Sequence, residues 1–180
     1  MIRERSSRGR RAAALAALLL LACAPILPGC ASEEVQTVND PFVGPMRSFA
    51  IGLPGGGYMD MQGISVREAQ GRFTLTVTVM QGGDSLAVAH VGDPGEFKVG
   101  DQILAFANAA EARPNARPFG NGVVTQWQLM YSLDAAQAKQ MAAGPLIAFK
   151  VQVGGEVHQV SLSSGKAEKF RSNMALLTSR

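Results

Sequence analysis

Alternating apolar and polar residues mark two stretches of the chain, 73–80 and 123–133. In the first, phenylalanine, leucine or valine occupies every second position and threonines stand between them; in the second, Trp127, Leu129 and Tyr131 share one parity. Because successive side chains of a β-strand point to opposite faces, both stretches predict half-buried strands. Two further strands are expected at 86–91 and 102–107.

A β-hairpin is predicted around Gly154-Gly155, because glycines tolerate the positive φ angles that a two-residue turn requires. Its strands are expected at 146–153 and 156–162. The register places one continuous apolar face across the two strands. Its pairs are Val151 with His158, Phe149 with Val160, and Ile147 with Leu162.

Two short helices complete the predicted elements. Asp134 is a suitable N-cap for a helix over 135–143, which Gly144-Pro145 would end. A terminal helix is expected from about Lys166, since Phe170, Met174 and Leu177 lie three to four residues apart and could cover the sheet. Prolines and glycines within 109–122 predict a loop there.

The N-terminal thirty residues have a different character. Five arginines and one glutamate lie within Met1–Arg11, an alanine and leucine run follows over 12–21, and Leu27-Pro28-Gly29-Cys30 precedes a polar stretch. A membrane-spanning helix needs about 20 apolar residues, so this shorter run predicts a secretory signal, residues 1–29.

Leu27-Pro28-Gly29-Cys30 resembles the lipobox of bacterial lipoproteins, in which the cysteine thiol takes a diacylglycerol and the freed amine a third acyl chain. The resemblance implies acylation of Cys30, with Cys23 in Leu20-Leu21-Ala22-Cys23 as the alternative. Two or three acyl chains hold a protein on a bilayer effectively without release. An ordinary signal cut near Ala31 is the remaining alternative.

The same resemblance implies a place in the bacterial cell envelope, facing the periplasm and bound to the membrane through covalent lipid. Ala31 is not the aspartate that commonly retains such proteins in the inner membrane, so the outer membrane is expected. Polar residues and two turn-forming prolines over 31–45 predict a tether, 30–45. Residues 46–180 are then expected to form one β-rich domain.

Removing the leader changes the charge balance of the chain. Residues 30–180 carry twelve basic and thirteen acidic side chains, a net charge of −1 in place of the +3 of the whole sequence. No basic patch remains to predict nucleic acid as a partner. Both cysteines lie within the first thirty residues, so a packed core and not a disulfide must stabilise the domain.

Candidate chemistry is sparse. His90 and Asp93 could begin a metal site or proton relay, but neither they nor His158 has a third partner at recognisable spacing. The glycines at 55–57 lack the Lys-Ser/Thr of a phosphate loop. Trp127 and Tyr131 are expected in the core. We therefore expect no catalytic residue, no metal site and no cofactor.

The stretch Val99-Gly100-Asp101-Gln102-Ile103-Leu104 resembles the Gly-Asp turn that opens a strand in bacterial PDZ domains. The later helix, Gly144 and hairpin follow the PDZ order, although the segment 101–144 is well over ten residues longer than usual. The order of elements over 127–177 is also similar to small periplasmic β-sandwich proteins, namely those called invasion-associated locus B and the lipoproteins that accompany type VI secretion. Neither resemblance transfers a catalytic residue.

These observations predict a mainly β (α+β) protein: a single small antiparallel β-sandwich or a PDZ-like barrel with one or two short helices. The expected function is a non-catalytic binding or structural role in the envelope, with an unidentified ligand. Envelope proteins or peptides are the expected partners besides the membrane. A PDZ-like peptide-binding module is the alternative, followed by an envelope enzyme.

Overall fold

The computed structural model of the chain describes residues 33–53, 61–82, 91–119 and 122–179. The leader with Cys23 and Cys30, the glycines at 55–57, His90 and nearly all of the strand expected at 86–91 lie outside the described residues.

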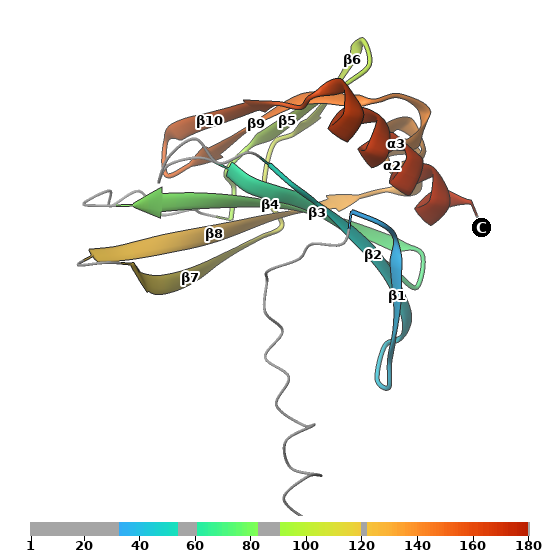
Figure 1. The fold of residues 1–180 in the computed structure, drawn as a ribbon, viewed down its shortest axis with the longest axis horizontal. Coiled ribbons are helices and arrows are strands. Elements are labelled where there is room, and N and C mark those ends of the chain that lie inside the picture. Colours follow the sequence, from blue (N-terminus) through green and yellow to red (C-terminus); the bar gives the residue numbers. More distant parts are fainter. Residues whose placement is uncertain (1–32, 54–60, 83–90, 120–121, 180) are drawn as a thin grey trace, which may run out of the picture. The chain divides into compact units, whose positions relative to one another are not determined.

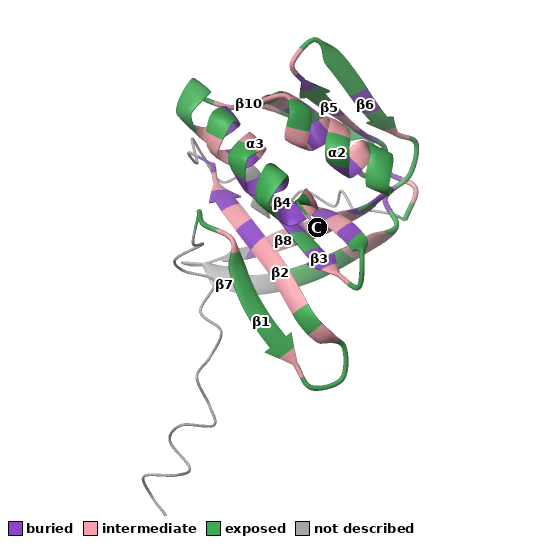
Figure 2. Ribbon diagram, turned by 90° about the vertical axis from the view of Figure 1, so that its right-hand side faces the viewer, coloured by how far each residue is buried: buried purple, intermediate pink, exposed green. Residues whose placement is uncertain are grey.

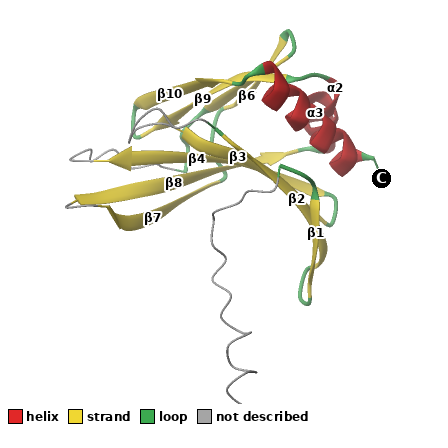
Figure 3. Cartoon of the chain, in the orientation of Figure 1, coloured by secondary structure: helices red, strands yellow, loops and turns green. Residues whose placement is uncertain are grey.

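The described residues form two antiparallel sheets and two helices (Figures 1 and 3). The six-stranded sheet has the order β1 (Gln36–Asp40), β2 (Gly44–Gly52), β3 (Met61–Ala69), β4 (Arg72–Gly82), β8 (Gly122–Leu133) and β7 (Glu111–Phe119). The four-stranded sheet has the order β10 (Glu156–Ser161), β9 (Leu146–Val153), β5 (Gly95–Val99) and β6 (Gln102–Phe106). The helices are α2 (Ala135–Ala143) and α3 (Ser164–Thr178). The predicted mainly β, antiparallel class is confirmed, and the sheets are not closed into a barrel.

The two strands with the clearest alternation are neighbours in the six-stranded sheet. In β4 and β8, Val79 lies opposite Trp127, Val77 opposite Leu129, and Leu75 opposite Tyr131. All six side chains are buried, whereas the intervening threonines of β4 are partly exposed. The period-two pattern therefore predicted both the strands and their buried face correctly.

Aromatic rings join this sheet to the four-stranded one. Tyr131 of β8 lies edge-on to Phe97 of β5, with ring centroids 5.5 Å apart, and Phe97 stacks on Phe149 of β9 at 5.8 Å. All three side chains are at most 2% exposed. Gly95 lies against the Tyr131 ring so closely that an added Cβ would be only 2.8 Å from Cζ. The missing side chain at this position lets the sheets approach.

Local sequence signals set the limits of α2. The Asp134 carboxylate accepts a hydrogen bond from the Gln137 amide, and the Gln137 side chain accepts one from the Asp134 amide, which completes a capping box. The helix ends at Gly144, whose backbone is extended and not left-handed. Pro145, which cannot continue the helix, and the packing of Gly144 against Val99 explain this ending.

Helix α3 contacts both sheets, through β9 and β2. Its buried face includes the predicted Phe170, Met174 and Leu177, which confirms the terminal helix. Phe170 meets Phe49 of β2 edge-on at 5.3 Å. In Figure 3 the two helices lie side by side at one end of the paired sheets.

The loop predicted over 109–122 is wrong, because 111–119 form β7. This strand pairs only with β8 and is an edge of the sheet, where Pro114 and Pro118 do not interrupt a ladder on both sides. β7 was not predicted from the sequence because prolines are a loop signal, whereas proline is excluded only from central strands and is tolerated in an edge strand. The location of this segment at an edge is a property of the tertiary structure.

The tether predicted over 30–45 is also wrong from Gln36 onward. Residues 36–40 form β1, and Gly44-Pro45 begin β2. Asp40 ends β1, and residues 41–43, beginning with Pro41, connect the two strands as a hairpin. The turn signal was therefore real but belongs to the sheet.

The hairpin around Gly154-Gly155 has the predicted register, with Phe149 opposite Val160 and φ angles of 55° and 94° at the two glycines. The expected continuation of its apolar face to Ile147 is wrong. The pairing of β9 with β5 shifts by one residue there, so that Leu146 lies opposite Val99 and is buried while Ile147 is 38% exposed. A bulge reverses which side chain faces the core.

Phe149→Ala should lower the free energy of unfolding by about 3 to 5 kcal/mol, because it removes a buried ring from the contact between the sheets. Lys150→Ala is the control on the opposite face. Its ion pair with Glu96 is largely exposed, so the loss should be within about 0.5 to 1 kcal/mol. Urea denaturation of both variants measures the difference, and equal losses would contradict the assigned core.

Candidate functional site

An open pocket of about 430 Å³ lies where the ends of α2 and α3 meet β2, β3 and the start of β4. Its apolar lining comes from Pro45, Phe73, Ala135 and Leu177. Its polar lining comes from Arg47, Glu68, Gln70, Lys139 and Thr178, with Gly71 at the adjacent turn. An apolar lining with a few polar groups is the usual composition of a small-ligand site.

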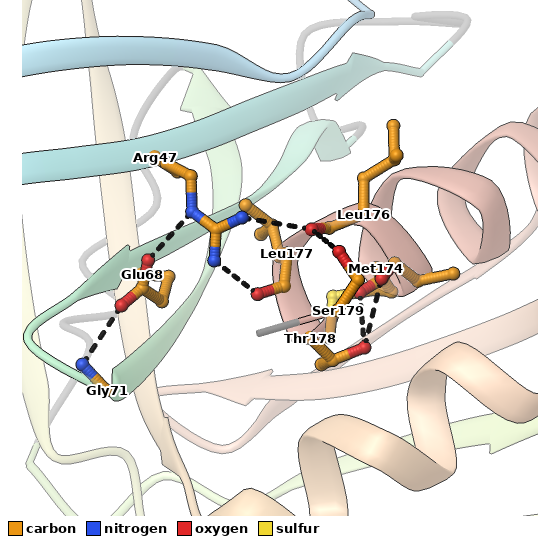
Figure 4. A network of polar contacts seen from close by, with 9 residues as sticks. Arg47, Glu68, Gly71, Met174, Leu176, Leu177, Thr178 and Ser179 are labelled. Atoms are coloured by element: carbon orange, nitrogen blue, oxygen red, sulfur yellow. Dashed lines mark hydrogen bonds and ion pairs between the residues drawn. The ribbon is translucent and has the colours of Figure 1, made fainter.

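Arg47 is the central polar group of this pocket (Figure 4). Its Nε donates to Glu68 Oε2 at 3.0 Å, and its Nη1 and Nη2 donate to the carbonyls of Leu176 and Leu177 at 3.0 and 2.6 Å. The Glu68 Oε1 atom accepts from the Gly71 amide at 2.9 Å. One guanidinium thus joins β2, β3 and the C-terminal end of α3.

The electrostatics of this arrangement are favourable. The last carbonyls of a helix lack intrahelical partners and carry partial negative charge, which a cation at the C-terminus offsets. The Arg47 and Glu68 side chains are only 12% and 10% exposed, so their opposite charges compensate each other away from water. Arg47 and Glu68 therefore fix the shape of the pocket.

Sequence reasoning did not identify Arg47 and Glu68, although a signal was present. Arg47 has the same parity as the buried Phe49 and Ile51, and Glu68 has the same parity as Ile64 and Val66. Charged residues in the inward phase of two adjacent strands predict a buried ion pair once the strands are known to be neighbours. Arg47 and Glu68 lie directly opposite each other in the register of β2 and β3.

The predicted polar residues lie elsewhere. His158, on β10, is partly buried, and its Nε2 is 3.9 Å from the Glu156 carboxylate. Asp93 is 8% exposed and its carboxylate accepts from the Gly154 amide at 3.3 Å. Within the described ranges, no group of three histidine, cysteine or acidic side chains is placed to hold a metal ion.

Tyr131 is a core residue with a polar contact near Asp93. Its hydroxyl donates to the Pro94 carbonyl at 3.4 Å, and both tyrosine and tryptophan lie in the core, as predicted. Burial raises the pKa of Tyr131 above its ordinary value, and the negative charge of Asp93 adds to the effect. The Tyr131 hydroxyl therefore stays protonated to a more alkaline pH in the folded protein than in the unfolded chain.

Comparison with protein-family models, curated proteins and solved structures finds no match for this chain. The described residues include no helix that is both long and apolar enough to cross a membrane.

Arg47→Met should destabilise the protein by about 2 to 4 kcal/mol, because it removes the cation that joins Glu68 to the end of α3. The double variant Arg47→Met/Glu68→Met should lose less, since it also removes the buried negative charge. Arg113→Met is the matched control, because the ion pair of Arg113 with Glu111 is largely exposed. Thermal and urea denaturation provide the comparison. If the double variant loses more stability than Arg47→Met alone, the two side chains are not coupled as proposed.

The raised pKa of Tyr131 predicts a loss of stability in alkali. Above about pH 10 the tyrosine of the unfolded chain ionises while that of the folded chain stays protonated, so the unfolding free energy falls as the pH rises. The variant Tyr131→Phe should show a smaller decline over the same range. Urea denaturation at a series of pH values tests this, and parallel declines in the two proteins would show that Tyr131 is not responsible.

Proposed function

We propose that this chain is a lipid-anchored protein of the bacterial cell envelope whose domain faces the periplasm and acts by binding and not by catalysis. The observation that carries the proposal is the N-terminal order of a basic segment, a short apolar run and Gly29-Cys30. Acylation of Cys30 would supply the membrane attachment. Ala31, where an aspartate would favour the inner membrane, supports the outer membrane as the location.

The structure of the domain is compatible with this attachment. The first described residue, Glu33, is only three positions after Cys30, and its carbonyl accepts a hydrogen bond from the Asn173 side chain of α3. The described domain therefore begins within three residues, along the chain, of the proposed anchor. The net charge of −1 after the leader supports partners other than nucleic acid.

The pocket supports a binding role. Its most buried polar groups, Arg47 and Glu68, form hydrogen bonds with each other and with the backbone. Groups engaged in this way favour a role in shaping a preformed binding site over a role in proton transfer to a ligand. Lys139 and Gln70 add polar groups to its lining. A small amphipathic molecule or a peptide segment with an apolar side chain fits this combination of apolar and polar lining residues.

A PDZ-like peptide-binding function is the second candidate. The segments that carry the resemblance lie together, because β5, β6, β9 and β10 form one sheet and the Gly100 amide donates to the Pro145 carbonyl after α2. The additional length over 101–144 corresponds to β7 and β8, which belong to the other sheet. Titration with a library of C-terminal peptides, with and without a free carboxylate, discriminates PDZ-like peptide binding from ligand binding in the pocket. Binding that requires the free carboxylate would favour the PDZ-like function.

The anchor proposal predicts that the mature protein begins with an acylated Cys30. Mass spectrometry of the N-terminal peptide from membrane-extracted protein should find the added acyl mass on that residue. Cys30→Ser should abolish the modification and release the protein from the membrane fraction. The matched variant Cys23→Ser should keep the acylation and stay in the membrane fraction. Acylation that depends on Cys23, or an unmodified terminus, would overturn the assignment.

A further inference from the structure

The tip of the β1–β2 hairpin exposes apolar side chains. This hairpin tip consists of Pro41, Phe42 and Val43, and Phe42 is 94% exposed while Val43 is 40% exposed. Val38, on the adjoining strand, is 53% exposed. The hairpin extends beyond the neighbouring strands, and β1 is exposed along nearly its whole length (Figures 1 and 2). A phenylalanine in this position contributes nothing to the core.

The geometry of the turn does not explain Phe42. The Asp40 carboxylate accepts from the amides of Phe42 and Val43 at 2.8 and 2.9 Å, and Gly44 adopts the positive φ of 87° that follows such a turn. These contacts require an aspartate and a glycine, but any side chain could occupy position 42. Together with the exposed Val38 and Val43, its apolar side chain forms a small exposed apolar group, which favours an interaction outside the domain.

The hairpin tip is rigid enough to act as a contact. Besides the two bonds to Asp40, the Gln70 side chain donates to the Val43 carbonyl at 3.0 Å and ties the tip to the β3–β4 turn. An apolar side chain on a fixed turn loses little conformational entropy when it binds. This favours a contact made repeatedly with one kind of surface.

The covalent chain brings a bilayer close to this hairpin. Glu33 is bound to the buried Asn173, and three residues span at most about 10 Å, so acyl chains on Cys30 would hold this side of the domain near the membrane. β1 begins three residues after Glu33 and leads directly to the tip. Tethering raises the effective concentration of the bilayer at the hairpin, so a weak apolar contact becomes populated.

We propose that the hairpin tip inserts Phe42 and Val43 into the interfacial layer of the membrane that holds the lipid of Cys30. This second contact rests on the proposed acylation and fixes how the domain is oriented on the bilayer. The charges around the tip have both signs, with Asp40 in the turn itself and Arg72 next to the β3–β4 turn that Gln70 ties to it. The contact is therefore apolar and is directed to zwitterionic lipid, without dependence on anionic headgroups.

The full-length lipoprotein offers a direct test, because the sequence after Cys30 contains no cysteine and an acylated Cys30 has no free thiol. Phe42→Cys and Val157→Cys are made separately, labelled with an environment-sensitive fluorophore and reconstituted into phosphatidylcholine vesicles that contain nitroxide-labelled lipid. Val157 is the matched control, a valine that is 66% exposed on the other sheet. The fluorophore at position 42 should be quenched several-fold more strongly than that at position 157.

A second pair of proteins tests the phenylalanine itself. A fluorophore at Val43→Cys should be quenched when Phe42 is present and several-fold less in Val43→Cys/Phe42→Ser, because the serine removes the apolar ring that enters the membrane. Position 42 is exposed, so this substitution should leave the fold unaffected. Vesicle flotation separates the two proposals. If the protein floats but the label at position 42 is quenched no more than the label at position 157, the hairpin proposal is wrong and the anchor proposal stands. The same conclusion follows if the label at position 42 is shielded in the absence of lipid, by another copy of the chain or another protein. Failure to float overturns both.

Discussion

The contact between Tyr131, Phe97 and Gly95 is the constraint on which the remaining structure depends. It brings the four-stranded sheet against the six-stranded one, and it requires glycine at position 95 because a Cβ there would overlap the tyrosine ring. The buried Tyr131 hydroxyl in turn needs a hydrogen-bond acceptor, which the Pro94 carbonyl provides. With the sheets fixed in this way, β9 and β2 lie where α3 can pack on both.

The position of α3 has consequences for the candidate site. Its C-terminal carbonyls accept hydrogen bonds from Arg47, whose charge is balanced by Glu68, and these groups form much of the polar lining of the pocket. The middle of the same helix binds the Glu33 carbonyl through Asn173. A single helix therefore joins the pocket to Glu33, at the beginning of the described domain.

The function proposed above depends on attachment to the membrane. The side chains of Asp93, at the β9–β10 turn, and Arg47, at the C-terminal end of α3, are engaged in structural contacts. The hairpin tip is different, since Phe42 has no role in its own turn. Such a residue, whose character the fold does not require, is where a surface interaction is most readily inferred.

The sequence by itself determined the elements whose signals are local: the alternation of β4 and β8, the N-cap at Asp134, the Gly154-Gly155 turn and the helix carrying Phe170. These follow from periodicity and backbone preferences, which act within a few residues. Only the tertiary structure decided that 111–119 is an edge strand despite its prolines, that 36–40 pairs with β2, and that a bulge exposes Ile147. The Arg47 and Glu68 pair belongs with these, because the energy of a buried charge depends on a partner 21 residues away and on a helix 129 residues away. Contacts between distant segments carry no local signature.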